Sequence, residues 1–329
     1  MTWRGSKVLV TGAGGFIGSH LVNALAERGA EVTALVRYNS RNDWGMLEEM
    51  YRAGKGGVRV IAGDVTDANC VQRAVEDNEV VFHLAALIGI PYSYEAPESY
   101  VKTNLLGTLN ILSASLRAGV GRVVQTSTSE VYGTAIYTPI DEAHPLQGQS
   151  PYSATKIAAD KMAEAYSCSF SLPVVTLRPF NTYGPRQSAR AVIPTIITQA
   201  LSGDTINLGS LAPVRDFTYV GDTVRAFILA AEKKGAVGKT IHTGSGIGIS
   251  IGDVARKILL KVNPDARIVS GTDRMRPAKS EVMQLVCDNR LARKTLGWRP
   301  EVSLDEGLSR TITWMKEHQE IYKAGRYTV

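Results

Sequence analysis

The chain has 329 residues, of which 44% are hydrophobic and 21% charged, a balance typical of a globular protein with a sizeable core. The net charge of +6 suits an anionic ligand, but the basic residues form no stripe with interleaved aromatics, so nucleic acid is not an expected partner. Three widely spaced cysteines without a C-x-x-C pair predict a reduced, cytoplasmic protein without a metal site, and the apolar run 80–90 is too short to span a membrane.

The first half of the chain alternates short β-branched runs with amphipathic stretches. Strands are predicted over residues 7–11, 31–36, 58–62, 80–85, 122–126 and 174–177, and helices over 16–28, 66–75, 97–118 and 152–170. This alternation predicts an α/β fold of the doubly wound Rossmann type, in which helices cover both faces of a parallel sheet.

After Arg178 the pattern changes, because Pro and Gly interrupt much shorter elements. We expect a smaller, loop-rich α/β lobe here, which binds the substrate. The predicted NAD(P)-binding domain covers residues 1–178 and returns around 216–246. The predicted substrate lobe covers 179–215 and 247–329 and ends on an amphipathic helix, 304–317.

A glycine-rich turn joins the first strand to the first helix. Gly12, Gly15 and Gly18 have the spacing G-x-x-G-x-x-G. Glycines allow the backbone to approach a pyrophosphate closely, and a helix N-terminus stabilises its charge. Because the turn has a strand before it and a helix after it, the motif predicts a dinucleotide site rather than a turn needed only for packing.

The end of the second strand indicates which dinucleotide is bound. An acid there would bind the ribose hydroxyls of NAD, but this chain has Arg37. An arginine could neutralise the 2′-phosphate of NADP, so NADP is slightly favoured over NAD. Alternatively, Arg37 stacks on the adenine or lies in solvent. Asp64, after the third strand, either contacts the adenine or caps a helix.

A tyrosine and a lysine four residues apart predict a proton-transfer site. Tyr152 and Lys156 lie on one face of a helix, where the ammonium would lower the pKa of the phenol. Thr128 follows a predicted strand and could share a hydrogen bond with Tyr152 and a substrate hydroxyl, while Glu130 could be a second base. The alternative is that these are turn-forming hydroxyls and a surface acid.

Five motifs together resemble the extended short-chain dehydrogenases that act on nucleotide sugars. They are TGAGGFIG (11–18), HLAA (83–86), STSEVYG (127–133), YSATK (152–156) and RPFNTYGPRQ (178–187). The resemblance extends over almost the whole chain. It implies an NAD(P)-dependent enzyme whose partner is a nucleotide-diphosphate sugar. It also implies a homodimer, in which the helices 97–118 and 152–170 form a four-helix bundle with their copies.

The resemblance also implies roles for individual residues. Thr128, Tyr152 and Lys156 would form the redox triad. The substrate would contact Asn181 and Arg215 at its diphosphate and Arg276 at its nucleotide. The residues expected to bind the cofactor are Gly12, Gly15, Phe16, Ile17, Gly18, Arg37, Asp64, Val65, Leu84, Ala85, Ala86, Tyr152 and Lys156.

Within this family, Glu130 favours dehydration. Sugar 4-epimerases usually have a small residue there, whereas dehydratases have a Glu that removes the proton from carbon 5. Deoxythymidine-diphosphoglucose dehydratases have Asp-Glu where this chain has Ser129-Glu130, so the usual acid for the departing hydroxyl is replaced. The Thr-Ser-Glu pattern resembles GDP-mannose 4,6-dehydratase, whose Glu could serve as both base and acid. The segment 38–45 resembles dehydratases of the legionaminic-acid type, which act on N-acetylhexosamines.

The expected activity is therefore that of a nucleotide-sugar 4,6-dehydratase, which produces a 4-keto-6-deoxyhexose and regenerates a retained cofactor in each turnover. The alternatives are a uronate decarboxylase, in which the Thr-Ser-Glu pattern also occurs, a 4-epimerase and a 5,6-dehydratase. An NAD(P)-sensing regulator is a more distant alternative. The intact set Thr128, Tyr152 and Lys156 argues against a regulator, since a sensor needs no proton-transfer group.

Overall fold

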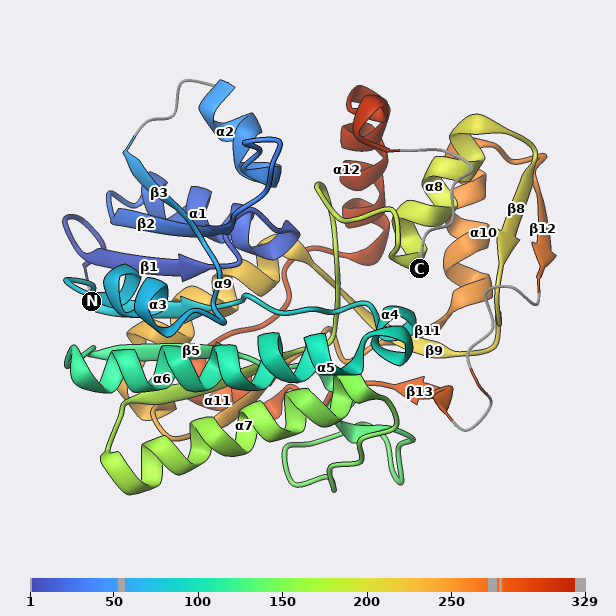
Figure 1. Ribbon diagram of the computed structural model, residues 1–329. Coiled ribbons are helices and arrows are strands. Elements are labelled where there is room, and N and C mark those ends of the chain that lie inside the picture. The colour runs from blue at the N-terminus through green and yellow to red at the C-terminus, as the bar shows by residue number, and fades with distance from the viewer. Residues whose placement is uncertain (1, 53–56, 272–276, 278–279, 323–329) are drawn as a thin grey trace.

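A computed structural model describes residues 2–52, 57–271, 277 and 280–322. The chain forms two lobes, with the N-terminus in the lobe on the left of Figure 1 and the last long helix near the other lobe. The larger lobe is built around a sheet, and the smaller one has three helices and several short strands.

Within the described residues, seven parallel strands form the sheet of the first lobe in the order β10-β6-β5-β4-β1-β2-β3. The strands are β1 (Lys7–Thr11), β2 (Glu31–Arg37), β3 (Val58–Gly63), β4 (Val80–His83), β5 (Arg122–Thr126), β6 (Val174–Pro179) and β10 (Thr240–Thr243). The order reverses direction between β1 and β4, as it does in a doubly wound sheet. The predicted Rossmann fold is confirmed.

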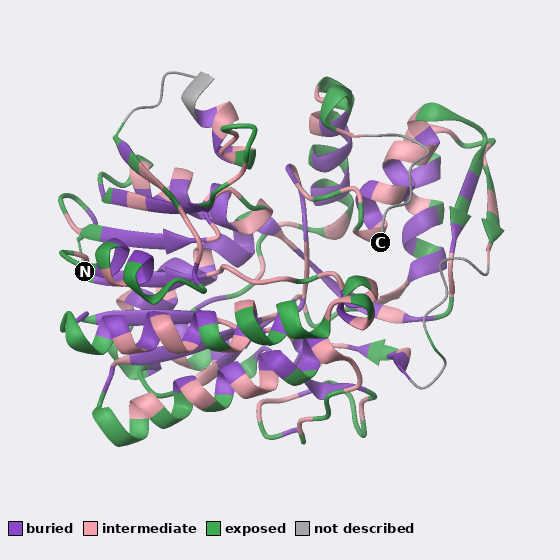
Figure 2. Ribbon diagram, in the orientation of Figure 1, coloured by how far each residue is buried: buried purple, intermediate pink, exposed green. Residues whose placement is uncertain are grey.

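Helices cover both faces of this sheet. One face carries α1 (Phe16–Glu27), α9 (Val220–Glu232) and α11 (Arg290–Leu296), and the other carries α3 (Ala68–Val75), α6 (Gly107–Arg117) and α7 (Pro151–Phe170). Alternate strand residues enter opposite cores, so that Val8 and Val10 face α1 while Leu9 faces α3 and α6. The buried strands between exposed helix faces are visible in Figure 2.

The second lobe is assembled from shorter pieces. Its strands are β7 (Asn181–Tyr183), β8 (Thr205–Leu208), β9 (Val214–Tyr219), β11 (Gly248–Ser250), β12 (Arg267–Ser270) and β13 (Gln284–Leu285). Its helices α8 (Val192–Ser202), α10 (Ile251–Val262) and α12 (Leu304–Glu317) share one apolar core. Strand β9 pairs with β7, β11 and β13, and β8 pairs with β12.

The remaining elements are short and lie in the connections. They are η1 (Gly45–Leu47), α2 (Glu48–Arg52), α4 (Ile90–Glu95), α5 (Pro97–Tyr100), the π-helix η2 (Val101–Leu106), η3 (Ser129–Tyr132), η4 (Lys234–Ala236) and η7 (Gln319–Ile321). The predicted helix 97–118 is thus a continuous run of α5, η2 and α6. The element α11, in a segment that the sequence placed in the substrate lobe, packs against β10 and α9 of the first lobe.

Several boundaries differ from their predictions by one or two residues, and for α3 and β4 the contacts beside the boundary are clear. Helix α3 starts at Ala68 instead of residue 66, because the Asp67 carboxylate accepts hydrogen bonds from the amides of Asn69 and Cys70. Strand β4 ends at His83 instead of residue 85, and the next two amides donate to the Thr11 hydroxyl.

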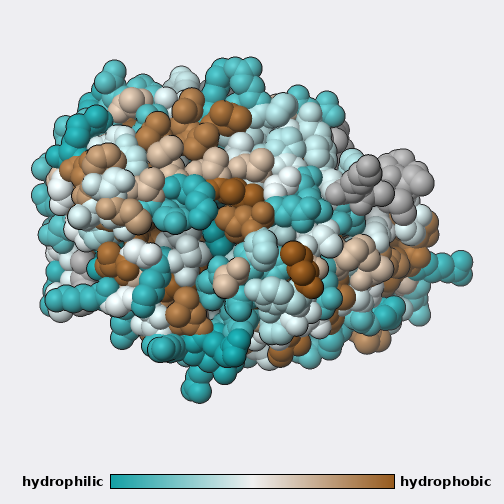
Figure 3. Space-filling model, turned by 90° about the horizontal axis from the view of Figure 1, so that it is seen from below, coloured by the Kyte–Doolittle hydropathy of each residue, from teal (hydrophilic) through white to brown (hydrophobic). Residues whose placement is uncertain are grey.

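The surface carries apolar side chains in separate patches. Figure 3, which views the molecule from below, shows several brown areas divided by hydrophilic ones. On the helices predicted to form a bundle, Val101, Leu106 and Phe170 are 41%, 44% and 54% exposed. Among the described residues, no helix has both the length and the apolar character needed to cross a membrane.

Candidate active site

The glycine-rich turn brings β1, α1 and the end of β4 into close contact. Gly12 has a φ of +67°, and a Cβ atom built on it would lie 2.8 Å from the amide nitrogen of Ala85. A Cβ atom on Gly18 would overlap the Gly12 carbonyl oxygen. Both glycines are therefore required by contacts within the protein, whether or not a dinucleotide is bound.

The N-terminus of α1 is open to an anionic ligand. Helix α1 starts after Gly15, and no described side chain caps it, so its first amides have no side-chain acceptor. Phe16 and Ile17 form this first turn and are partly exposed. A pyrophosphate fits such a cradle by accepting hydrogen bonds from the helix amides.

The segment 84–86 runs beside this turn and is held by a buried threonine. The Thr11 hydroxyl lies 3.2 Å and 3.1 Å from the amides of Leu84 and Ala85, and 2.7 Å from His83 Nδ1. Burial lowers the pKa of His83 to about 3, so its imidazole is neutral at physiological pH. Ala86, like the two residues before it, is partly exposed.

Arg37 and Asp64 lie at the carboxyl ends of β2 and β3. Their closest charged atoms, Nε and Oδ2, are 3.9 Å apart, and the side chains are 78% and 42% exposed. Asp64 accepts hydrogen bonds from the amide and hydroxyl of Thr66, so it forms a turn, and Asp67 is the residue that caps α3. Val65, next to Asp64, is buried against Gly107 of α6.

Tyr152 and Lys156 lie in the first two turns of α7, whose N-terminus is capped by Ser150. The Ser150 hydroxyl accepts from the amide of residue 153 in a reciprocal capping box. The Tyr152 phenol is buried and hydrogen-bonded to the Thr128 side chain. The Lys156 ammonium donates to the Thr126 carbonyl over 2.6 Å.

The electrostatic surroundings of the two groups differ. The predicted lowering of the Tyr152 pKa by Lys156 is not found in the chain alone: burial raises this pKa, the Thr128 hydrogen bond opposes the rise, and the Glu130 carboxylate reinforces it. Burial lowers the pKa of Lys156 to about 8, and the Asp160 carboxylate opposes that shift. The structure thus brings together four predicted catalytic residues, because Glu130 is close enough to Tyr152 to affect its pKa.

The short helix η3 carries Ser129 and Glu130. Thr128 caps the N-terminus of this helix: its hydroxyl accepts a hydrogen bond from the Glu130 amide over 3.2 Å. Ser129 is 3% exposed, whereas Glu130 is partly exposed.

The residues predicted to bind the substrate lie on two paired strands of the second lobe. Asn181 on β7 pairs with Phe217 of β9, two residues beyond Arg215. Within the described part of the chain, the buried Oδ1 atom of Asn181 has no hydrogen-bond partner. Arg215 is 5% exposed, and its guanidinium lies 3.5 Å from the Glu281 carboxylate. Arg276 lies outside the described residues.

Asn104 is a residue of this region that the sequence did not reveal. It lies in the π-helix η2. Its side-chain oxygen accepts a hydrogen bond from the Leu87 N–H over 2.8 Å. Its side-chain nitrogen donates to the Leu87 carbonyl over 3.0 Å and to the Thr155 hydroxyl over 3.2 Å. Asn104 therefore ties the segment after β4 to α7. No local sequence pattern marks Asn104, because Lys102 and Thr103 stand beside it and its burial at a π-helical turn is a property of the folded chain.

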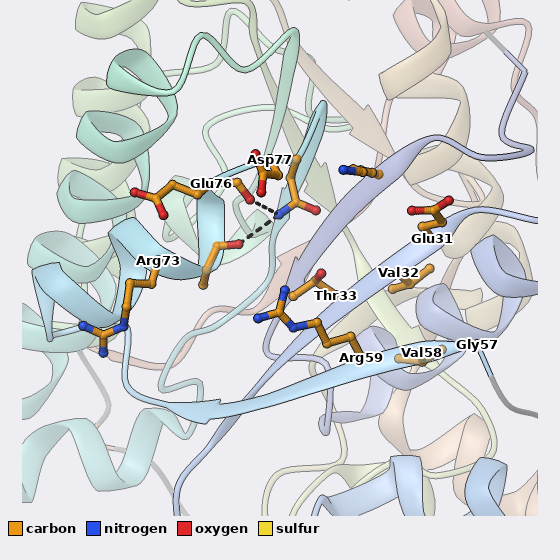
Figure 4. A pocket seen from close by; sticks show the side chains of 12 residues that line it. Glu31, Val32, Thr33, Gly57, Val58, Arg59, Arg73, Glu76 and Asp77 are labelled. Carbon is orange, nitrogen blue, oxygen red and sulfur yellow. Dashed lines mark hydrogen bonds between the residues drawn. The ribbon is translucent and has the colours of Figure 1, made fainter.

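A separate hollow of about 520 Å³ lies at the opposite edge of the sheet (Figure 4). Lys7, Glu31 and Val58, the first residues of β1, β2 and β3, contribute to its lining, with Arg59 and Asp77 beside them. Ligands of doubly wound sheets bind at the carboxyl ends of the strands, so this hollow is no part of the candidate site. In the described ranges, no three His, Cys, Asp or Glu side chains are grouped so that they could hold a metal ion.

Comparison with known proteins identifies the family. The sequence profile of the family "GDP-mannose 4,6 dehydratase" matches residues 9–311. The chain therefore belongs to this family and is an enzyme with an NAD(P)-binding type of Rossmann lobe, as the resemblance of its motifs indicated.

Relatives of similar identity carry out different reactions. A dTDP-glucose 4,6-dehydratase of Streptomyces antibioticus is 32% identical over 95% of this chain and 93% of its own. A UDP-glucose 4-epimerase of Mycolicibacterium smegmatis is also 32% identical, over 95% and 100%. A UDP-N-acetyl-alpha-D-glucosaminuronate decarboxylase of Bacillus cytotoxicus is 33% identical over 94% and 98%.

The solved structures agree with the fold. The dTDP-glucose 4,6-dehydratase DesIV of Streptomyces venezuelae, solved with NAD and TYD bound, has a TM-score of 0.86 to this chain. The two are 31% identical, and the match covers 96% of this chain and 99% of DesIV. Overall identity therefore does not separate the possible reactions, and the residues of the site have to do so.

Proposed function

We propose that this enzyme is a nucleotide-sugar 4,6-dehydratase, which converts a nucleotide-diphosphate hexose to its 4-keto-6-deoxy form. The observation that carries the proposal is the place of Glu130, whose amide donates to the Thr128 hydroxyl over 3.2 Å and whose carboxylate is among the groups that raise the pKa of Tyr152. An epimerase needs no such second base, because the hydrogen on carbon 5 is never removed in its reaction.

The cofactor is NAD(P), and the residues around the glycine-rich turn fit it. Helix α1 begins without a side-chain cap directly after this turn, so its first amides can donate to a pyrophosphate. The proposed contacts are the turn and first helical residues for the pyrophosphate, Arg37, Asp64 and Val65 at the adenosine end, and the segment 84–86 with Tyr152 and Lys156 at the nicotinamide. A nicotinamide bound there would supply reversible hydride transfer between carbon 4 and carbon 6, so the cofactor would be regenerated in each turnover and could remain bound.

The chain's own residues move the protons. Tyr152 removes the proton of the hydroxyl on carbon 4, with Thr128 aligning the phenol and the Lys156 ammonium stabilising the phenolate. Glu130 removes the proton on carbon 5, which the new ketone has made acidic. The hydroxyl on carbon 6 leaves as water after it receives a proton. Since Ser129 is a neutral hydroxyl, Glu130 supplies that proton as well. A proton from solvent, taken up by Glu130, is then added to carbon 5 when the hydride returns to carbon 6.

The substrate's diphosphate would lie against β7 and β9. Arg215 offers a guanidinium, and the side-chain amide of Asn181, at the start of β7, can donate its N–H groups to phosphate oxygens. Arg276 would bind the nucleotide. The Glu281 carboxylate beside Arg215 offsets part of its charge, so the diphosphate has to be bound with Glu281 in contact with Arg215.

NADP is the slightly preferred cofactor in this proposal, because Arg37 occupies the end of β2 where NAD-binding sheets have an acid. A homodimer is also part of the proposal. Its support is the exposure of Val101, Leu106 and Phe170 on the helices that would form the bundle. Light scattering coupled to gel filtration measures the oligomeric state, and a monomer at micromolar concentration would contradict it.

Replacing Glu130 by Gln tests the dehydration itself. The variant is expected to oxidise carbon 4 but not to eliminate water. A 4-keto hexose that has lost no water should then accumulate together with reduced nicotinamide, which is measured by its near-ultraviolet absorbance. In heavy water, the unaltered enzyme should place deuterium on carbon 5 of its product. Glu164→Gln, an exposed change on α7, is the matched control.

The same assay separates the rival reactions. An epimerase gives no deuterium at carbon 5, and a decarboxylase consumes only a uronic acid and releases carbon dioxide. A 5,6-dehydratase gives an alkene between those carbons, which proton NMR identifies. Elimination at the normal rate by Glu130→Gln would show that the proposed mechanism is wrong.

A further inference from the structure

A buried ion pair lies directly behind the proposed catalytic residues. Arg178 on β6 donates from Nε and Nη2 to one oxygen of Asp160 on α7, over 3.0 and 2.8 Å. Both side chains are 4% exposed. The same oxygen accepts from the Ser127 hydroxyl over 2.6 Å, and Asp160 lies one helical turn beyond Lys156. The pair therefore joins α7 and β6 to the end of β5, just before Thr128.

The third guanidinium nitrogen extends this contact to η3. Arg178 Nη1 donates to the hydroxyl of Tyr132, a fully buried residue that ends η3 two positions after Glu130. The same hydroxyl contacts Nε2 of His242 on β10, and His242 Nδ1 lies 3.2 Å from the Ile140 carbonyl.

The direction of these hydrogen bonds follows from their partners. A carbonyl can only accept, so His242 Nδ1 carries the hydrogen and Nε2 accepts. Burial lowers the pKa of His242 to about 3, which leaves one ring hydrogen near neutral pH. The Tyr132 hydroxyl thus accepts from Arg178 and donates to His242, so its position is defined on two sides.

The two bases depend on this hydroxyl to different degrees. Tyr152 belongs to a capped helix of 20 residues. Glu130 belongs to a helical turn of four residues, in which the Glu130 carbonyl accepts from the Gly133 amide and the Val131 carbonyl from the Gln147 amide. Removing the Tyr132 hydroxyl should therefore disturb the turn more than the helix.

We propose that the Tyr132 hydroxyl, held by Arg178 and His242, is a positioning group that places Glu130 for the removal of the carbon-5 proton. The inference rests on the proposed function, because it assigns that proton to Glu130. Asp160 anchors Arg178 and is a positioning residue of the same set.

The change Tyr132→Phe removes one oxygen atom and keeps the ring. We expect elimination to slow by about 10- to 100-fold, the range that a small misplacement of a reacting group causes. Oxidation of carbon 4 should change by no more than about twofold, so a 4-keto hexose and reduced nicotinamide build up. Uptake of solvent deuterium at carbon 5 should slow equally. Tyr137→Phe, which removes a hydroxyl that contacts only Asp141 in the neighbouring loop, should change neither step.

A second pair of variants tests the acceptor side without altering Tyr132. The change His242→Gln keeps an oxygen that can accept from Tyr132 and an N–H that can reach the Ile140 carbonyl, so it should restore most of the elimination rate. His242→Leu keeps the bulk but no acceptor, and should behave like Tyr132→Phe.

The outcomes separate this inference from the proposed function. If Glu130→Gln blocks elimination while Tyr132→Phe slows both steps equally or neither, the inference is wrong and the dehydratase remains. Equal rates in His242→Gln and His242→Leu would contradict it too. If Glu130→Gln eliminates water normally, the proposed function itself fails.

Discussion

The two halves of the proposed site are held in position by different kinds of contact. At the cofactor side, glycine backbone packs on backbone, as in the approach of Gly18 to the Gly12 carbonyl. At the catalytic side, charged and polar side chains from separate elements are buried against one another, as in Asp160 and Arg178. The first arrangement needs a few residues close in sequence. The second needs partners that only folding brings together, so it is more sensitive to the loss of any one polar atom.

The largest effect is expected at Tyr152. Tyr152→Phe removes the proton-transfer group from the catalytic side and should lower turnover by about 100- to 10,000-fold, the usual contribution of a general base. Cofactor affinity should remain nearly unchanged, because the glycine-rich turn is intact. Steady-state rates and a cofactor titration on the same preparation measure both. Turnover close to that of the unaltered enzyme would remove Tyr152 from the mechanism.

Acid should weaken both sides through their buried histidines. His83 and His242 have a pKa near 3 in the folded protein because of burial, against about 6.5 when unfolded. Between these values the unfolded chain binds more protons, so the free energy of unfolding should fall as pH falls, by up to about 1.4 kcal/mol per pH unit for each histidine. Above pH 6.5 this contribution is complete and constant.

Urea unfolding at pH 7.5, 5.5 and 4.5 (the last about two units below the ordinary histidine pKa) measures that slope. His83→Gln and His242→Gln should each make the fall of the unfolding free energy with pH less steep, because each removes the contribution of one histidine. A slope unaffected by either change would mean that these histidines do not control the acid sensitivity.

The backbone contact at the cofactor side can be broken with one methyl group. In Gly18→Ala, the new Cβ atom would overlap the Gly12 carbonyl, so the turn has to shift. We expect a loss of about 1–3 kcal/mol of stability, typical of overpacking, together with weaker cofactor binding. Gly235→Ala is the control, since a Cβ atom there meets nothing within 4 Å. Equal melting temperatures for the two variants would contradict this account of the turn.

The smallest effect is expected at Arg37, whose side chain is 78% exposed. Arg37→Ala should weaken NADP binding by about two- to fivefold, as for an exposed charge pair, and leave NAD binding unchanged. Asp64→Asn removes the carboxylate 3.9 Å from Arg37 and should strengthen NADP binding to a similar degree. Fluorescence titrations with both cofactors measure this. Preference for NAD in the unaltered enzyme, with no response to Arg37→Ala, would make Arg37 a stacking or surface residue.

Local patterns in the sequence determined much of the first lobe. Strand 7–11, strand 122–126 and the terminal helix 304–317 have the predicted bounds, because alternation and helical periodicity record which side of an element is buried. The Gly12–Gly18 turn and the Tyr152–Lys156 pair were also visible, since each motif lies within one short stretch of chain. The division of residues between the two lobes and the individual roles in the site stay predictions.

Only the tertiary structure decided how distant residues meet. The short strands of the second lobe are two to six residues long, too short for alternation to distinguish them from loops. Arg215 and Glu281 are 66 positions apart in the sequence, and only the folding of the chain makes them neighbours. Asp160, Arg178, Tyr132 and His242 come from four elements, and each residue by itself is an ordinary polar side chain. Periodicity shows that a side chain is buried, but its partner depends on how sheets and helices pack, and so the contacts behind Glu130 could not be predicted from the sequence.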